Sequence, residues 1–302
     1  MWYLKVENEV LKQYLTYISF FFVVTWVTPV FSCESTNNCI QKGQWDIGLA
    51  IGIGARSNPL VDGKNFPNVI LFDVAWYGDE FYFDNGEIGY KWLQKDAFGV
   101  ETYLTLDREM TFFELWHPGN VTVPAALPSS PAIEPPTSET DDGDLSPAEE
   151  PLSVNDISDR NWAINFGTRV HYYHANYEIS FSLETDVSGV HQGQKATLSY
   201  QYFWSGDTWR FMLRPSLVWK SANLANYYYG VDKHDTENTD YHYQVSAGLQ
   251  PGIALLYTQK INADWHWITN LSYRKLHSSM VHSPIVEENN VTNVFIGLGR
   301  RF

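Results

Sequence analysis

The sequence lacks the usual marks of a soluble domain and of a helical membrane protein. Only 18% of its 302 residues are charged, whereas a soluble domain is about one quarter charged. After residue 32 the chain has no apolar run of the roughly 20 residues that a membrane-spanning helix needs. An ordinary soluble domain and a bundle of membrane helices are therefore both disfavoured.

Basic residues and cysteines are also scarce. The chain has 20 Lys and Arg against 35 Asp and Glu, which gives a formal net charge of -15. Nucleic-acid binding requires clustered cations, so no nucleic-acid partner is expected. The two cysteines, Cys33 and Cys39, are too few for a cysteine metal site, and no cofactor is expected. In an oxidising compartment this pair predicts a small disulfide loop.

The N-terminal residues predict export. Lys5 and Lys12 lie in a polar head, and an apolar stretch over 14–32 follows. This stretch ends in the small-residue pattern of Val30 and Ser32, which a signal peptidase could accept. We predict a cleaved signal peptide over 1–32, with a membrane anchor as the alternative because the stretch is long. Cleavage would leave Cys33 at the N-terminus, so a lipid-modified Cys33 is the alternative to the disulfide.

Aromatic residues, by contrast, make up 16% of the chain, and many follow a period of two. Within 175–184 the large apolar side chains take every second position, at Tyr177, Ile179, Phe181 and Leu183. Polar residues occupy the positions between them, which is typical of a strand with one apolar face. Similar segments of about 10 residues recur, the length at which a tilted strand crosses a bilayer.

A soluble β-sandwich alternates in the same way, but two features favour a membrane barrel. Soluble strands average about 5–6 residues, roughly half the length predicted here. The apolar faces also end repeatedly in tryptophan, as the aromatic girdles of membrane barrels do. These tryptophans are Trp45, Trp76, Trp92, Trp162, Trp204, Trp209, Trp219 and Trp265. The last alternating segment ends in Phe302, and outer-membrane barrels also present an aromatic residue there.

The pattern predicts an all-β fold, a transmembrane antiparallel up-and-down β-barrel of about twelve strands, with about ten as the alternative. The strands are predicted near 45–54, 68–77, 80–84, 87–93, 97–107, 161–171, 174–185, 194–204, 207–219, 242–256, 259–277 and 292–302. Short periplasmic turns at 78–79, 94–96, 205–206 and Thr258 would alternate with long external loops at 55–67, 108–160, 186–193, 220–241 and 278–291. A further strand at 110–116 would break this alternation.

Residues 118–159 differ in kind from the rest of the predicted barrel, which spans 33–302. They contain eight of the 14 prolines and nine acidic residues, with no Lys or Arg. Such a composition cannot bury a core, so we predict a disordered external loop. A cation-binding role for Asp141, Asp142 and Asp144 is the alternative, although a flexible loop lacks the fixed geometry of a calcium site.

Several motifs resemble one known family. They are the glycine-rich IGLAIGIGARSNPL at 47–60, DVSG followed by HQG at 186–193, YYYGV at 227–231, SPIV at 283–286 and the terminal GLGRRF. From about residue 45 onward, outside the acidic insert, the chain resembles the MltA-interacting protein family, also called MipA/OmpV. The loop residues that carry the resemblance are Asp186, Gly189, Tyr227, Tyr228, Tyr229, Gly230, Ser283 and Pro284.

The resemblance implies an outer-membrane barrel in contact with outer-membrane lipid. It also implies a scaffold, because the namesake is regarded as joining a lytic transglycosylase to a penicillin-binding protein that synthesises peptidoglycan. The alternative is a narrow passive pore for small solutes. A scaffold requires surface on the periplasmic side, where the predicted topology offers only short turns and residues 33–44.

Charged residues on the polar face of the strands are expected to point into the lumen. They are Arg169, Arg210, Arg214, Arg274, Asp73, Glu101, Glu178 and Glu184. Because buried charges without partners are costly, we expect them to pair and to plug the lumen. Left unpaired, they would line a narrow channel.

The sequence does not favour an enzyme. Nucleophile and base candidates exist in His171, His174, Ser188, His191 and Ser283. However, the chain has no strand–turn–helix nucleophile elbow and no histidine pair with metal-ligand spacing. Hydrogen bonding in the barrel interior is the role expected for these histidines.

Overall fold

The computed structural model describes residues 42–122 and 151–302. Three predictions fall outside these residues: the signal peptide over 1–32, the fate of Cys33 and Cys39, and the structure of residues 123–150. They stay predictions.

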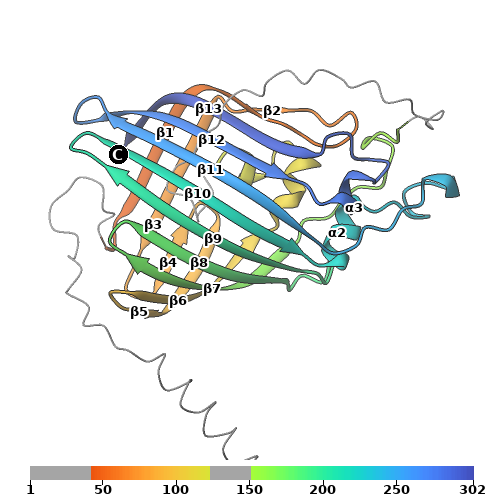
Figure 1. Cartoon of the computed structure of the whole chain (residues 1–302), viewed down its shortest axis with the longest axis horizontal. Helices are drawn as coiled ribbons and strands as arrows, with labels where there is room; N and C mark the ends of the chain where they lie inside the picture. The colour runs from red at the N-terminus through yellow and green to blue at the C-terminus, as the bar shows by residue number, and fades with distance from the viewer. Residues whose placement is uncertain (1–41, 123–150) are drawn as a thin grey trace, which may run out of the picture. The chain divides into compact units, whose positions relative to one another are not determined.

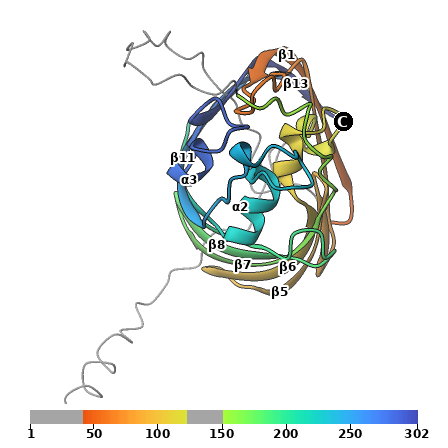
Figure 2. The same cartoon turned by 90° about the vertical axis from the view of Figure 1, so that its right-hand side faces the viewer.

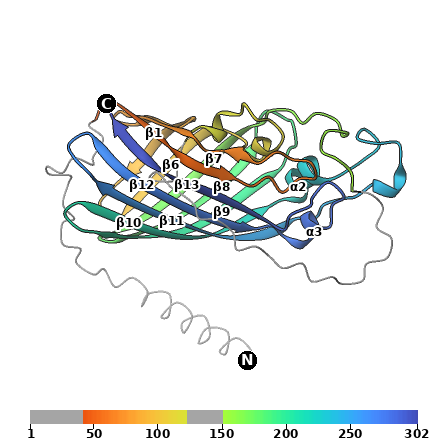
Figure 3. The same ribbon diagram turned by 90° about the horizontal axis from the view of Figure 1, so that it is seen from above.

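The described residues form a closed antiparallel β-barrel (Figure 1, Figure 3). Strands adjacent in the wall are adjacent along the chain, and the last strand returns to pair with the first. β2 (Phe66–Pro67) has only two residues and pairs with β1 alone, so the closed wall has twelve strands. The other strands are β1 (Trp45–Arg56), β3 (Ile70–Tyr77), β4 (Phe81–Asp84), β5 (Glu87–Gln94), β6 (Phe98–Leu106), β7 (Ile164–His174), β8 (Tyr177–Asp186), β9 (Gln194–Ser205), β10 (Trp209–Lys220), β11 (Gly248–Lys260), β12 (Trp265–Lys275) and β13 (Asn290–Arg301). The prediction of twelve strands is confirmed, and the alternative of ten is wrong.

The wall is apolar outside and polar inside, which is the reverse of a soluble protein. On β8 the alternating Ile179, Phe181 and Leu183 are exposed, whereas Ser182 and Glu184 between them are buried. A soluble monomer rarely exposes a contiguous apolar patch of more than a few hundred Å². Here the exposed apolar side chains continue around the strands, so the exterior suits lipid.

Glycines allow β1 and β13 to approach closely where the barrel closes. An added Cβ at Gly52 would overlap the carbonyl oxygen of Ile296, and one at Gly54 would overlap that of Val294. Only glycine fits where a partner backbone comes this near. The glycine-rich first motif of the sequence is therefore part of the closing contact.

Two predicted boundaries are wrong, and the alternative strand at 110–116 does not form. Thr258 is not a turn, because it lies inside β11 and pairs with Arg210 on one side and Ile268 on the other. The turn follows at 261–264, where the Asn262 side chain accepts hydrogen bonds from the Asp264 and Trp265 N–H groups. β11 begins at Gly248 rather than 242.

The two ends of the barrel differ. One end, the short-turn end, has connections of two to four residues between paired strands, for example 175–176 between β7 and β8. At the other end, the long-loop end, long connections fold into the mouth of the barrel as a cap (Figure 2). The cap contains η1 (Arg108–Phe112), η2 (Pro118–Asn120), α2 (Ala222–Tyr229), η3 (Thr239–Tyr241) and α3 (Ser278–Val281).

The cap has its own hydrophobic core. α2 begins after Ser221, whose Oγ caps the Leu224 N–H, and it buries one face that includes Tyr228 and Tyr229. These side chains pack with residues from the other long loops, so the cap is a single cluster. Its buried members are Leu60, Met110, Phe112, Leu224, Ala225, Tyr228, Tyr229, Val231, Val245, Leu276, Met280, Ile285, Val286 and Val291. No helix within residues 42–122 and 151–302 has the length and apolar character needed to span a membrane.

The boundaries of the predicted disorder over 118–159 need correction. Residues 151–159 join the cap, because the Leu152 N–H donates to the Pro284 carbonyl and the Val154 N–H donates to the Val61 carbonyl. Residues 118–122 form η2 and a short extension that bonds to β3. Among the prolines and acids, Leu152 and Val154 provide hydrophobic side chains that pack against the cap. Residues 123–150 lie outside the described part.

The wall is interrupted between β3 and β6. β4 pairs with β3 only from Tyr77 to Ala75, and the turn at Asn85 and Gly86 then sends the chain back as β5. Beyond that turn no described strand links β3 residues 70–73 to β6 residues 105–106. The gap, called here the wall interruption, is occupied by 121–122, whose Val121 carbonyl accepts the Phe72 N–H.

Candidate functional site

A buried ion-pair network lies on the lumen side of β5, β6 and β7. The Arg169 guanidinium donates two hydrogen bonds to the Glu87 carboxylate, at 2.9 and 2.8 Å, and one to Glu101 at 2.6 Å. The central guanidinium carbon of Arg169 lies 4.1 Å from the centre of the Tyr103 ring. Such a fork satisfies buried charges that would otherwise be costly.

The network continues toward the short-turn end through His171. The His171 ring nitrogens lie 3.2 Å from a Glu101 oxygen and 2.7 Å from a Glu178 oxygen. Gln201 donates to the second Glu178 oxygen at 3.2 Å. These groups line a lower cavity of about 210 Å³, whose lining has four acidic side chains against Lys91, Arg169 and His171.

A larger upper chamber of about 350 Å³ lies between this network and the cap. Arg169 and Glu87 line both spaces and so form the partition between them. Six cationic and three acidic side chains line the upper chamber. The lumen is therefore basic toward the long-loop end and acidic toward the short-turn end.

The other predicted lumen charges lie on the inner face as well. Asp73 accepts hydrogen bonds from Arg301 at 2.8 Å and from Asn85 at 2.9 Å. Glu184 pairs with Lys195 at 2.7 Å. Of the remaining arginines, Arg214 and Arg274 line the upper chamber, whereas Arg210 lines neither space. Within the described residues, the ion pairs between strands join strands one or two places apart in the wall, rather than opposite sides of the lumen.

A second buried ion pair lies where the upper chamber meets the cap. The Glu109 carboxylate accepts a hydrogen bond from the Tyr229 hydroxyl at 2.5 Å and pairs with the Lys220 ammonium at 2.8 Å. Burial raises the pKa of the Glu109 carboxyl, but the Lys220 and Arg274 charges outweigh it and keep that pKa below its usual value. Burial and the nearby Glu109 charge raise the pKa of Tyr229, so the hydroxyl stays protonated and donates.

The Asp186 carboxylate organises the loop that carries the DVSG and HQG motifs. It accepts hydrogen bonds from the N–H groups of Ser188, Gly189, His191 and Gln192, and also from the Ser188 hydroxyl. Gly189 has a φ of +77°, which favours glycine in this turn. The motif therefore folds into a loop whose backbone N–H groups surround the Asp186 carboxylate.

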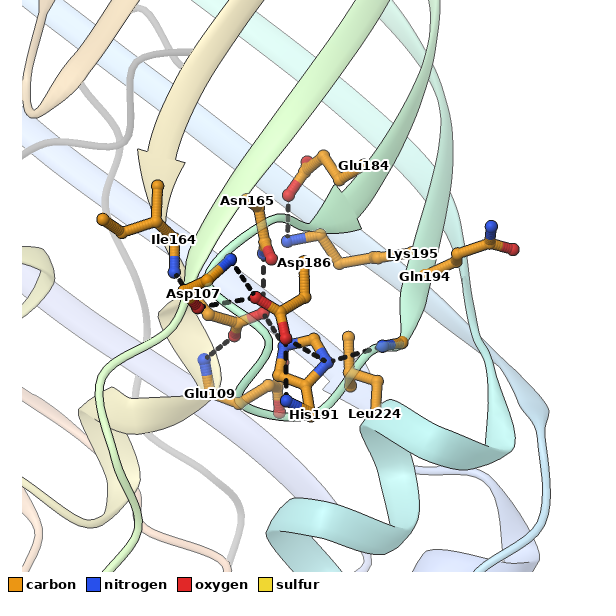
Figure 4. A network of polar contacts seen from close by, with 12 residues as sticks. Asp107, Glu109, Ile164, Asn165, Glu184, Asp186, His191, Gln194, Lys195 and Leu224 are labelled. Carbon is orange, nitrogen blue, oxygen red and sulfur yellow. Dashed lines mark hydrogen bonds and ion pairs between the residues drawn. The ribbon is translucent and has the colours of Figure 1, made fainter.

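His191 connects that loop to the base of the cap (Figure 4). Its Nδ1 accepts the Gly193 N–H at 2.9 Å, so the ring proton lies on Nε2, which faces the Asp107 carboxylate at 3.6 Å. Burial raises the pKa of Asp107, but the nearby His191 ring, the Lys195 charge and the Glu109 N–H together lower it below its usual value. Asp107 also accepts from Asn165 at 2.7 Å.

The five nucleophile and base candidates do not form a catalytic set in the described structure. His191 Nδ1 is occupied by a backbone N–H, and the Ser188 hydroxyl donates to Asp186 instead of a histidine. His171 lies in the ion-pair network, and His174 stacks on Tyr177 at the short-turn end. Among residues 42–122 and 151–302, no group of three or more His, Cys, Asp or Glu is placed to hold a metal ion.

The other motif residues meet inside the cap. The Ser283 hydroxyl donates to the Tyr229 carbonyl, and the Pro284 carbonyl accepts from Leu152. The Tyr227 hydroxyl accepts the Asn161 N–H at 2.7 Å. Gly230 ends α2 beside Asn226, where a Cβ would overlap the Asn226 side chain. The YYYGV and SPIV motifs thus join two loops that lie far apart in the sequence.

Sequence reasoning missed several charged residues of the lumen. Glu87 begins the short strand β5, and Lys195 precedes the residues used to define the polar face of β9. The alternation of β9 could have revealed Lys195, because it shares the inward face of Ser199 and Gln201. Arg108 and Glu109 lie in a loop, where no periodic signal indicates which side chains enter the barrel.

Comparison with known proteins agrees with this architecture. Residues 47–302 match the family model described as MltA-interacting protein MipA. Outer membrane protein OmpV of Vibrio cholerae is 25% identical over 140 residues, which are 46% of this chain and 54% of OmpV. The chain thus spans about half the length of that relative.

Two solved structures are more distant. A Pseudomonas aeruginosa FadL homologue is 8% identical, with 85% of this chain and 86% of that chain covered at a TM-score of 0.37. The N-terminal β-barrel domain of Pseudomonas aeruginosa OprF is 14% identical, with 46% and 88% covered at a TM-score of 0.23. The family match covers most of the chain and fits the lipid-facing wall of twelve strands. The chain belongs to the MipA family and is an outer-membrane β-barrel protein.

Proposed function

We propose that the protein is a membrane-anchored scaffold that binds peptidoglycan enzymes at its short-turn end and is neither an enzyme nor an open pore. The observation that carries the proposal is the cap, whose hydrophobic core fills the long-loop mouth. An open diffusion pore needs a wet passage through that mouth. The proposed partners are a lytic transglycosylase, to which the family name refers, and a penicillin-binding protein.

The turns of the short-turn end expose more acidic than basic side chains, and the basic ones include Lys42 and Lys95. In outer-membrane barrels the short turns face the periplasm, where peptidoglycan enzymes work. Four of its turns carry an exposed aspartate, namely Asp79, Asp96, Asp207 and Asp264. An excess of negative charge attracts a partner with a basic surface and accelerates its association. We therefore expect the partner to contact these turns through Lys and Arg.

Site-specific crosslinking tests this proposal. A photo-crosslinking amino acid at Asp207 is expected to capture a purified periplasmic lytic transglycosylase. The matched control is Glu288, which is also acidic and exposed but lies in a long loop. Capture at Glu288 and not at Asp207 would contradict the proposed binding surface, as would an absence of capture at every short turn.

A narrow pore is the second candidate, because two polar spaces are stacked inside the barrel. Conductance in a planar bilayer separates the two functions. The scaffold, with its cap in place, is expected to give no stepwise current. Discrete current steps from the folded full chain would favour the pore instead.

A further inference from the structure

The upper chamber contains more cations than its own carboxylates can neutralise. All three acidic side chains that line it already have cationic partners. Glu87 is bound by Arg169, Glu184 by Lys195, and Glu109 by Lys220. No lining carboxylate is therefore left for the other arginines of the chamber.

Three of the four arginines that remain are Arg56, Arg108 and Arg274; the fourth, Arg214, has an interaction of its own. Among the described residues, none of the three forms an ion pair with a carboxylate within 4.0 Å. The Nε atoms of Arg56 and Arg274 are buried and have no hydrogen-bond partner. Arg108 and Arg274 also repel the charge of Arg56. Gathering like charges in a buried space is costly unless an anion joins them.

The chamber offers the geometry that an oxyanion requires. A guanidinium presents its N–H groups as a planar fork that fits two oxygens of a phosphate. Nine serine and threonine side chains also line the chamber and can donate hydrogen bonds without adding charge. Its volume of about 350 Å³ accommodates a phosphate group together with a small attached moiety.

We propose that the upper chamber binds a phosphate-bearing anion through Arg56, Arg108 and Arg274. This inference is independent of the scaffold, because the chamber lies inside the barrel and the proposed partner surface lies at the short-turn end. The anion neutralises the excess positive charge and so stabilises the folded barrel.

The wall interruption defines two sources for the anion. Leu71 on β3, Leu106 on β6 and Thr122 between them all line the chamber, so this gap borders it directly. A phosphate group could belong to a small solute in the lumen, or to a lipid whose headgroup enters from the side of the wall. Phosphate is common to both sources, and the experiment distinguishes them.

The test measures the unfolding midpoint of the refolded full chain in detergent, with inorganic phosphate against chloride at equal ionic strength. Wild type is expected to be stabilised by phosphate. Arg274→Gln and Arg56→Gln are expected to bind phosphate about tenfold more weakly, because each loses one charged hydrogen-bonding group. In phosphate-free buffer Arg274→Gln is expected to be as stable as wild type or more stable, because the substitution removes a repelled charge. Arg56→Gln also loses the bonds that Arg56 donates to the Thr111 carbonyl and the Asn120 side chain, so its stability without phosphate is the baseline for its own titration.

Arg210→Gln is the matched control, because Arg210 lies on the inner face of β10 outside both spaces and should leave the phosphate effect unchanged. The lipid arm uses vesicles of phosphatidylcholine with and without phosphatidic acid. If phosphatidic acid stabilises the wild type and inorganic phosphate does not, the result supports the site and assigns it to a lipid headgroup. The proposal is overturned if neither probe stabilises the wild type, or if Arg210→Gln loses the effect as fully as Arg274→Gln.

Discussion

Arg169 on β7 binds Glu87 on β5 through two parallel hydrogen bonds, reaching past the strand that separates them. Glu101 on that intervening strand accepts a further bond from the same guanidinium. One arginine therefore links three strands from inside the barrel. It does so at the partition between the upper chamber and the lower cavity.

Replacing Arg169 with Met should destabilise the barrel strongly. The substitution leaves the Glu87 and Glu101 carboxylates without their main partner, and removal of one member of a buried pair costs about 3–5 kcal/mol. The measurement is the free energy of unfolding in urea, followed by tryptophan fluorescence in lipid vesicles. Adding Glu87→Gln to this variant should recover part of the loss, and a double variant with fully additive losses would show that the two residues do not act together.

Replacing Gly54 with Ala should hinder closure of the barrel. The new methyl group overlaps the Val294 carbonyl of β13, and overpacking of this kind costs about 1–3 kcal/mol. The folded fraction is measured as the heat-modifiable band on a gel. Gly99→Ala is the control, because its Cβ would meet side-chain atoms and no backbone: the Tyr173 side chain at 3.3 Å and the His171 Cβ at 3.6 Å. An equal loss of folded protein in both variants would mean that the contact between β1 and β13 is no more sensitive to an added methyl group than the wall at Gly99.

Replacing 123–150 with a Gly/Ser linker of equal length should leave the barrel folded. Leu152 and Val154, which contact the cap, follow the replaced segment and are kept in this variant. We expect a change below about 0.5 kcal/mol in the free energy of unfolding. Leu152→Ser, by contrast, should destabilise the cap. A barrel that fails to fold with the linker would show that 123–150 contributes to the fold.

The cap should lose stability in mild acid through His117. Burial and the Arg108 charge lower the pKa of His117 to about 4, and its Nδ1 accepts the Gly119 N–H at 3.0 Å. In the unfolded chain the ring titrates near 6.5, so between these values the unfolded chain binds more protons. The contribution of His117 to stability is therefore complete above pH 6.5 and declines as the pH falls toward 4.

The pH dependence can be measured by proteolysis of the chain near 118–122. His117→Asn retains a hydrogen-bond acceptor but does not titrate, so its protection should change less with pH than that of the wild type. If both proteins lose protection equally, another group causes the acid sensitivity.

Most of the wall could be predicted from the sequence because a strand between lipid and a polar lumen alternates apolar residues on its lipid face with polar residues on its lumen face. The segment from Glu178 to Leu183 shows this directly, since its apolar residues are exposed and its polar residues are buried or half-buried. The error at Thr258 has a local cause. β11 continues past it, and the turn depends on the Asn262 side chain, which a hydrophobic pattern does not reveal.

The cap and the charge pairing could not be predicted in the same way. Whether Tyr229 meets Glu109 depends on how two loops 120 residues apart fold into the mouth. Alternation places Arg169 on the inner face but does not choose between a neighbouring carboxylate and one across the lumen. The excess positive charge of the upper chamber depends partly on Arg108, a loop residue that alternation does not place inside the barrel.

The pairing of β1 with β13 also constrains how the protein is made. Asp46 and Arg301, whose side chains form an ion pair at this seam, are 255 positions apart. Such a distant contact forms slowly, and until it forms β1 offers an unpaired edge that invites aggregation. A chain on its way to the outer membrane must therefore be shielded until β13 reaches β1.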